Sequence, residues 1–257
     1  MFDDVQRIAR EAGSLAADYF TKLGNIAVES KGHLDLVTEA DRQVERLIGE
    51  RLEEAFPDDG IFGEEGAARQ TSSGRIWVID PIDGTFNYLR GSDQWAVSIG
   101  LYEAGQPRFG VVYAPLRDEF LVGGEGFAPT LNGNPLAARS GFDRSRAVCD
   151  IGFHPSIPAE EQLGAFRFVI EEAGMTFRCT GSAITALIDV ARGQVDGYFG
   201  LGISTWDLMA ILPILKHIGI TSTLDWNSIK LQDKLRFVCG TPEFIDVFSS
   251  HCPAGSR

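Results

Sequence analysis

Apolar residues recur along the first part of the chain at the spacing of helices that bury one face. Over residues 2–22 they fall at i, i+3, i+4 and i+7, and this period predicts an amphipathic helix. The same period predicts a second helix over residues 38–55, with Thr38 placed to cap its N-terminus. Pro57, followed by Asp-Asp-Gly, ends that helix.

The next part of the chain changes to short apolar or alternating runs separated by turn residues. Such runs predict strands, and several short ones in succession predict an antiparallel meander. The predicted strands cover residues 61–63, 75–80, 95–101, 109–114 and 119–123. Asn132-Gly133 then indicates a tight turn.

Helical and extended runs alternate in the second half. Helices are predicted over residues 160–173, 182–192 and 206–217, the last with Pro213 inside it, and a short strand over 195–199. The whole pattern predicts an α+β protein. We expect a first subdomain over residues 1–140, built on an antiparallel sheet, and a smaller α/β subdomain over residues 141–257.

The bulk composition narrows the class of protein. The chain has 257 residues, of which 44% are hydrophobic and 23% charged, so we expect a folded core except in residues 252–257. Its net charge of -13 disfavours a nucleic acid polymer as partner, because phosphate binding needs clustered Lys and Arg. No apolar run approaches the ~18 residues of a membrane span, and the first residues do not resemble a signal peptide.

Cysteine and histidine give no sign of a zinc site. The four cysteines lie far apart without a C-x-x-C pair, and the four histidines show no i, i+4 pair. Reduced, buried thiols in a cytoplasmic protein are therefore the expected state.

Five acids, in contrast, stand at the ends of predicted elements. They are Glu64, Glu65, Asp80, Asp83 and Asp207. Hard divalent cations prefer carboxylate, carbonyl and water oxygens. Two such cations about 4 Å apart can hold the attacking and leaving oxygens of a displacement at phosphorus.

The turn predicted after Asp80 suits such a site. Pro81 fixes φ and stiffens the chain, and Gly84 allows the backbone to approach a ligand closely. A helix that begins at Thr85 would present free N–H groups to a phosphate. The stretch from Asp80 to Thr85 therefore offers metal ligands and an anion site together.

Each acid taken alone has an ordinary structural explanation. Asp80 and Asp83 fit an Asp-rich turn, Glu64-Glu65 a solvated loop, Asp207 the first turn of a helix, and Asp41 a capping pair with Thr38. Their coincidence at element ends favours a shared site. Haloacid dehalogenase-like phosphatases use acids two residues apart, which share one side of a strand, whereas here the spacing is three.

The chain resembles the inositol monophosphatase superfamily, relatives of fructose bisphosphatase and of nucleotide bisphosphate phosphatases. The resemblance runs from about Val5 to Gly219. It rests on motifs in the family's order: "DLVTEAD" (35–41), "GEEG" (63–66), "WVIDPIDGTFNYLRG" (77–91), "GSA" (181–183) and "WD" (206–207). It implies a layered αβαβα sugar-phosphatase-type fold, Mg2+-dependent phosphomonoester hydrolysis by water, inhibition by lithium, and a homodimer.

The resemblance also implies a metal-ligand set. Glu64, Asp80 and the carbonyl of Ile82 would hold one Mg2+. Asp80, Asp83 and Asp207 would hold a second, and a third ion would lie by Glu64 with waters. Glu65 would be a metal-adjacent acid.

Further roles follow from the same resemblance. Thr85, linked to Asp41, and Glu64 would orient the attacking water. Lys31 would be the basic residue of a loop over the metals. The residues that would contact substrate are Asp83, Gly84, Thr85, Ala183 and Asp207.

The substrate side departs from the family pattern. Gly200 occupies the position of a glutamate that binds substrate hydroxyls, and Phe153 and His154 stand where a small serine is common. Lys216-His217 begins the stretch that is usually Glu-Ala-Gly-Gly, with no role assigned. The substrate therefore stays open among inositol monophosphate-like esters, histidinol phosphate, sugar phosphates and nucleotide bisphosphates. A non-catalytic regulatory protein that retains the fold is the alternative of another class.

Overall fold

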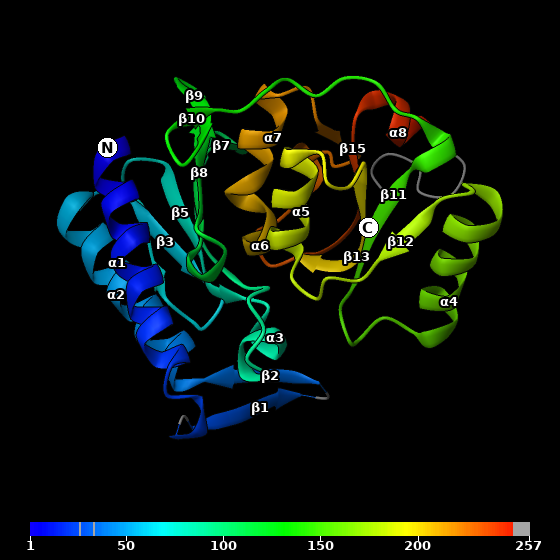
Figure 1. The fold of residues 1–257 in the computed structure, drawn as a ribbon. Helices are drawn as coiled ribbons and strands as arrows, with labels where there is room; N and C mark the ends of the chain where they lie inside the picture. The colour runs from blue at the N-terminus through cyan, green and yellow to red at the C-terminus, as the bar shows by residue number, and fades with distance from the viewer. Residues whose placement is uncertain (26, 33, 249–257) are drawn as a thin grey trace.

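Five layers of helices and sheets stack on one another in the computed structural model, which describes residues 1–25, 27–32 and 34–248 (Figure 1). Helices α1 (Phe2–Phe20) and α2 (Glu39–Ala55) form the first layer and pack against a large sheet. Three helices separate that sheet from a smaller one, and two more cover the far side. This is the αβαβα arrangement that the resemblance implied. The tail over residues 252–257 lies outside the described residues.

The large sheet has eight strands in the order β10-β9-β8-β7-β6-β5-β3-β4. Their bounds are β3 Gly60–Gly63, β4 Ala68–Arg69, β5 Arg75–Asp83, β6 Ala96–Glu103, β7 Gln106–Ala114, β8 Glu119–Gly124, β9 Phe127–Leu131 and β10 Asn134–Pro135. The antiparallel meander is confirmed from β5 onward, whereas β3 runs parallel to β5. A separate ribbon of β1 (Val28–Gly32) and β2 (Asp35–Thr38) leads into α2.

Both predicted N-terminal helices are confirmed. Val5 and Ile48 of their apolar stripes are fully buried with Trp77 and Ile79 of β5, whereas others, such as Leu15 and Leu47, are partly buried. Thr38 caps α2 as predicted, in a reciprocal capping box with Asp41.

The smaller sheet has five strands in the order β12-β11-β13-β15-β14, with β12, β11 and β13 parallel. Their bounds are β11 Val148–Phe153, β12 Thr176–Arg178, β13 Gly197–Ser204, β14 Thr221–Ser222 and β15 Lys234–Gly240. The strand predicted over 195–199 therefore lies further along the chain. Helix α4 (Ala159–Arg167), continued by a π-helical turn, and α8 (Pro242–Val247) cover its outer face.

The helices between the sheets correct one prediction. Helix α5 (Ala183–Arg192) is confirmed, but the single helix predicted over 206–217 is wrong, as is its place as the last helix. The chain forms α6 (Thr205–Met209) and α7 (Ile211–His217), because Pro213 has no N–H to donate to the carbonyl of Met209.

The division at residue 140 stays a prediction. The core between the sheets is formed by both parts of the chain, since Val78, Val112 and Leu121 pack with Leu187 and Ile214.

Candidate functional site

A β-bulge in β5 brings Asp80 and Asp83 to the same face of the sheet. Asp80 lies opposite Ser98 on β6 and Asp83 lies opposite Ala96, so three steps on β5 match two on β6. Without the extra residue, strand alternation would send the two side chains to opposite faces. The prediction that the strand ends at Asp80 in a tight turn is therefore wrong, because β5 continues to Asp83.

The extra residue also orients Ile82. Its side chain is fully buried in the core beneath α1 and α2. Its N–H donates to Asp80 Oδ1 at 3.1 Å, and its carbonyl accepts from Thr85 Oγ1 at 3.2 Å. The backbone of Ile82 therefore borders the same space as the two aspartates.

Asp207 reaches this space from the other side, on the first turn of α6. Its carboxylate accepts from the N–H of Ser204 at 3.0 Å in a capping box. One carboxylate oxygen from each of Asp80, Asp83 and Asp207 lies within 4.8 Å of the others. Asp207 therefore both caps α6 and belongs to the carboxylate cluster.

Asp83 ties β5 to the start of α5. Its Oδ2 accepts from the Ser182 hydroxyl and from the N–H of Ile184 at 2.7 Å. Ala183 lies between these two donors and lines the adjoining cavity.

Burial raises the pKa values of the three aspartates, and the charges of neighbouring carboxylates add to this effect for Asp80 and Asp207. Burial and the charges of Glu64, Asp83 and Asp207 raise the pKa of Asp80 well above its usual range. Burial raises the pKa of Asp83 to about 6, and burial with the charge of Asp83 raises the pKa of Asp207 to about 7. Asp80 Oδ2 is buried without a hydrogen-bond partner in the part of the chain that the structure describes. A divalent cation would supply the missing positive charge, so the oxygen donor set fits one.

Thr85 and Asp41 meet beside the carboxylates. Thr85 begins α3 (Thr85–Leu89), as the sequence suggested, and its hydroxyl lies 3.4 Å from Asp41 Oδ1. Asp41 Oδ2 accepts from the N–H of Thr38 at 2.8 Å and from its hydroxyl at 2.5 Å. Burial raises the pKa of Asp41 to about 6. One carboxylate thus caps α2 with one oxygen and contacts Thr85 with the other.

Gly84 precedes Thr85 in a conformation that favours glycine. Its φ is +91°, and a Cβ there would lie 2.7 Å from the Gln94 carbonyl oxygen.

The loop after β3 holds Glu64 and Glu65 through a residue that the sequence did not single out. Glu45, buried on α2, accepts from the N–H groups of Glu65 and Ala67, both at 2.8 Å. Glu64 lines the same cavity as Asp80, and its N–H donates to the Ile79 carbonyl at 3.2 Å. The only sequence signal for Glu45 is a carboxylate on the apolar face of a helix.

Two adjoining cavities form a cleft between the sheets. The carboxylate compartment, about 710 Å³, is lined by Leu36, Glu64, Asp80, Ile82, Gly84, Thr85, Phe86, Ser204, Trp206 and Lys234. The second compartment, about 650 Å³, is lined by Asp150, Ile151, Gly152, Ile157, Ala159, Gln162, Cys179, Ser182, Ala183, Tyr198, Gly202 and Ile203. Both share Leu34, Asp83, Phe153, His154, Pro155, Gly181 and Asp207.

The remaining predicted residues fall in different places. His154 lines both compartments, and its Nδ1 accepts from the Ser156 N–H at 3.2 Å. Gly200 lies inside the small sheet and lines neither compartment. Lys31 belongs to β1, but its side chain lies outside the described residues. Lys216 and His217 end α7 beside a separate surface pocket.

Lys234 is a cation that the sequence did not single out. Its ammonium donates to the Ser204 hydroxyl at 2.6 Å and lies 5.1 Å from the centre of the Trp206 ring. Its charge lowers the pKa of Asp207, against the larger effect of burial.

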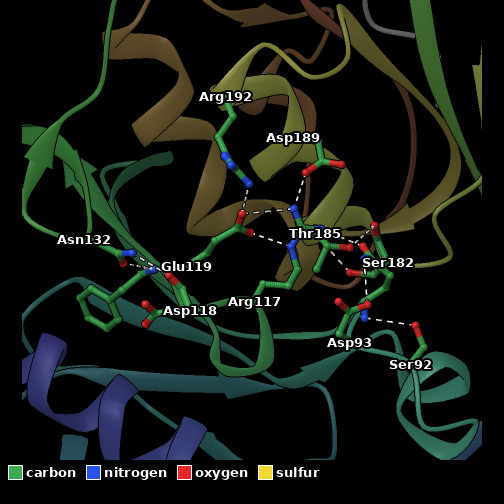
Figure 2. A network of polar contacts seen from close by, with 12 residues as sticks. Ser92, Asp93, Arg117, Asp118, Glu119, Asn132, Ser182, Thr185, Asp189 and Arg192 are labelled. Atoms are coloured by element: carbon green, nitrogen blue, oxygen red, sulfur yellow. Dashed lines mark hydrogen bonds and ion pairs between the residues drawn. The ribbon is translucent and has the colours of Figure 1, made fainter.

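A buried ion-pair network holds α5 against the large sheet (Figure 2). Arg117 pairs with Glu119 of β8 at 2.7 Å and with Asp189 of α5. Arg192 adds a second cation to Glu119, and Arg178 pairs with Asp189 at 2.9 Å. Because α5 also presents Ser182 and Ile184 to Asp83, the network fixes one wall of the cleft.

Comparison with known proteins places this geometry in context. The chain matches the model of the inositol monophosphatase family over residues 3–245. It is 36% identical over 231 residues to an inositol-1-monophosphatase of Synechocystis, which covers 87% of this chain and 80% of that protein. It is 35% identical over 225 residues to a fructose-1,6-bisphosphatase/inositol-1-monophosphatase of Aquifex aeolicus (86% and 84% covered). It is also 35% identical over 215 residues to the Nus factor SuhB of Xylella fastidiosa (83% and 78% covered).

Solved structures agree with the fold. An extragenic suppressor protein suhB from Bartonella henselae superposes with a TM-score of 0.86 at 27% identity, covering 95% of each chain. An IMPase from Thermotoga maritima superposes with a TM-score of 0.80 at 29% identity, covering 96% of each chain. Within the described residues, no helix has the length and apolar character to cross a membrane.

Proposed function

The chain belongs to the inositol monophosphatase family, and we propose that it is a Mg2+-dependent phosphomonoesterase acting on a small phosphorylated metabolite. One observation carries the proposal: the carboxylates of Asp80, Asp83 and Asp207 converge beside the Thr85 hydroxyl and Asp41. A contribution to the stability of the fold does not explain such a cluster, because burying carboxylates without cations costs folding free energy.

The family resemblance implies two metal positions, and the cluster of Asp80, Asp83 and Asp207 supports one of them. Glu64, Asp80 and the Ile82 carbonyl would hold one ion, and Asp80, Asp83 and Asp207 a second, with a third ion expected by Glu64. The lone Oδ2 of Asp80 supports its shared role. Bound divalent cations lower the pKa of water and neutralise charge on phosphoryl oxygens.

The chain's own groups would position the reactants. The Thr85 hydroxyl has one proton, which lies within reach of both the Ile82 carbonyl and Asp41. When the carbonyl binds a metal ion and the hydroxyl donates to Asp41, its oxygen would be left to accept a hydrogen bond from water. Glu64 would accept the other water proton. Gly84 and Thr85 line the carboxylate compartment, and their N–H groups would bind phosphate. Positioning and electrostatics of this kind supply most of the rate of phosphoryl transfer.

The second compartment would take the leaving group. Its volume of about 650 Å³ suits a small molecule rather than a polymer. Inositol monophosphate-like esters, sugar phosphates, histidinol phosphate and nucleotide bisphosphates stay candidates, and relatives are named for the first two classes. A cytoplasmic homodimer, and inhibition by lithium, stay predictions.

A second candidate function comes from the relatives named Nus factor SuhB. A regulatory protein of that kind would keep the fold without having to hydrolyse a phosphate ester. Mg2+-dependent phosphate release separates the two candidates.

The test is a phosphate-release assay over the four ester classes, with and without Mg2+. We expect activity only with Mg2+, and a loss of at least about 100-fold in Asp83→Asn and Asp207→Asn, as for loss of a major electrostatic contributor. Asp18→Asn, on the exposed face of α1, is the matched control and should keep full activity. Full activity in either cleft variant would refute the site, and an inactive wild type would favour the regulatory function.

A further inference from the structure

Two glycines make room for a tyrosine in the second compartment. Gly152 on β11 and Gly200 on β13 are register partners in the small sheet. A Cβ on Gly152 would lie 1.8 Å from the Tyr198 hydroxyl oxygen, and a Cβ on Gly200 would lie 2.8 Å from Tyr198 Cε1. A larger residue at Gly152 would displace the Tyr198 side chain, and one at Gly200 would displace Tyr198 or its neighbours Ile203 and Phe237. The ring therefore lies across both glycines.

The Tyr198 hydroxyl has no hydrogen-bond partner within residues 1–25, 27–32 and 34–248. The residue is 1% exposed, its ring packs on Phe237 with centroids 5.6 Å apart, and it nevertheless lines the second compartment. The hydroxyl oxygen is not among the fully buried side-chain atoms that lack a partner, so it is open to the compartment, where a ligand oxygen can bond it. This hydroxyl is thus placed to bond whatever occupies the compartment.

The hydroxyl is held in its protonated form. Burial and the charges of Asp150, Asp83 and Asp207 raise the pKa of Tyr198 well above its usual range. It therefore acts as a hydrogen-bond donor as well as an acceptor.

The neighbouring acid of this compartment is already engaged. Asp150 is buried, and it accepts from the N–H of Thr180 at 3.3 Å and from the Thr180 hydroxyl. The walls formed by Ile157 and Ile203 carry no polar side-chain group. Tyr198 is therefore a polar group of this compartment whose bonding capacity is left for a ligand.

We propose that Tyr198 is a specificity-determining residue whose hydroxyl bonds an oxygen of the leaving group. This inference rests on the proposed phosphatase function and adds to it a residue that distinguishes leaving groups with an oxygen in reach of Tyr198 from those without one. Tyr198 takes no part in the chemistry at phosphorus. It selects the ester by a bond that an unhydroxylated leaving group does not make.

The test is Tyr198→Phe, which removes one oxygen and keeps the ring. The probes are inositol 1-phosphate, fructose 1,6-bisphosphate and 2-glycerol phosphate, with phenyl phosphate as the ester whose leaving group has no further oxygen. We expect kcat/KM for the best hydroxylated ester to fall by about 3- to 10-fold, as for one neutral hydrogen bond, while phenyl phosphate is unaffected. Tyr102→Phe, a tyrosine outside both compartments, should change neither.

A binding measurement makes the outcome independent of turnover. With Ca2+ in place of Mg2+, calorimetry should show weaker binding of the hydroxylated ester to Y198F and unchanged binding of inorganic phosphate. An unchanged ratio of hydroxylated ester to phenyl phosphate in an active Y198F enzyme would overturn the role of Tyr198 alone. A wild type that neither turns over nor binds any of these esters would overturn the proposed function and this inference with it.

Discussion

Removal of divalent cations should make the folded protein less stable as the pH rises through the acid range. Burial raises the pKa of Asp83 to about 6, and burial with the charge of Asp83 raises that of Asp207 to about 7. In the unfolded chain an aspartate titrates near ~3.9. At pH values between the unfolded and the folded pKa values, the folded, metal-free chain binds protons that the unfolded chain has lost. Each rise in pH within that window therefore lowers the free energy of unfolding. The metal-free chain keeps its full stability only at pH values below the window.

The expected size follows from the same linkage. One retained proton lowers the free energy of unfolding by about 1.4 kcal/mol per pH unit, so the step from about pH 5 to about pH 7 removes roughly 2–3 kcal/mol. For a chain of 257 residues this corresponds to a fall in Tm of roughly 4–12 °C. Asp80, Asp83 and Asp207 interact strongly, so they titrate as a unit and their separate effects do not add.

Mg2+ should reverse this trend, because it binds the deprotonated carboxylates and competes with protons. The assay is differential scanning calorimetry across this pH range, in EDTA and in excess Mg2+. The rise in Tm on adding Mg2+ should be larger at the neutral end. Asp83→Asn should reduce the pH slope in EDTA, whereas Asp18→Asn should not. A metal-free Tm that is flat or rises with pH, or a Mg2+ effect independent of pH, would refute the reasoning.

Three further predictions concern packing and assembly. Arg117→Ala leaves Glu119 and Asp189 with only their outer cations, and should cost about 3 kcal/mol in urea unfolding; an unchanged midpoint would show that the network does not stabilise the fold. Gly110→Ala places a methyl group 2.0 Å from the Ala210 carbonyl oxygen, so it should cost roughly 1–3 kcal/mol, and an undiminished Tm would contradict that packing. Light scattering should give twice the chain mass of 28.0 kDa, as the resemblance predicts, and a mass of one chain would contradict the dimer.

The sequence patterns of the two N-terminal helices predicted their part of the structure correctly. The capping box of Thr38 and Asp41 spans three residues, and its chemistry does not depend on the rest of the fold. The stripes of α1 and α2 likewise repeat within each helix. Five acids were singled out by their place at the ends of predicted elements, and the structure brings Asp80, Asp83 and Asp207 of these together.

Features that depend on residues far apart in the chain could not be predicted from the sequence pattern. Strands β11 and β15 were missed, because Asp150 and Arg236 interrupt their apolar runs and their partners lie far along the chain. Glu45 has no feature in the sequence that sets it apart from other helix acids, because the loop that it holds lies 20 residues further along the chain. Gly200 was noted as a departure in sequence, but only the packing shows Tyr198 lying over it.

The bulge in β5 is where local sequence and overall fold combine to make the site. A regular strand would place one of Asp80 and Asp83 under α1 and α2, in the apolar core. The extra residue instead sends the Ile82 side chain into that core and leaves both carboxylates and the Ile82 backbone facing the cleft. Because burial raises the pKa values of these carboxylates, their ionised forms are expected to cost stability in the metal-free chain. A local irregularity that concentrates like charge is therefore explained by what the cleft binds, rather than by what it contributes to the fold.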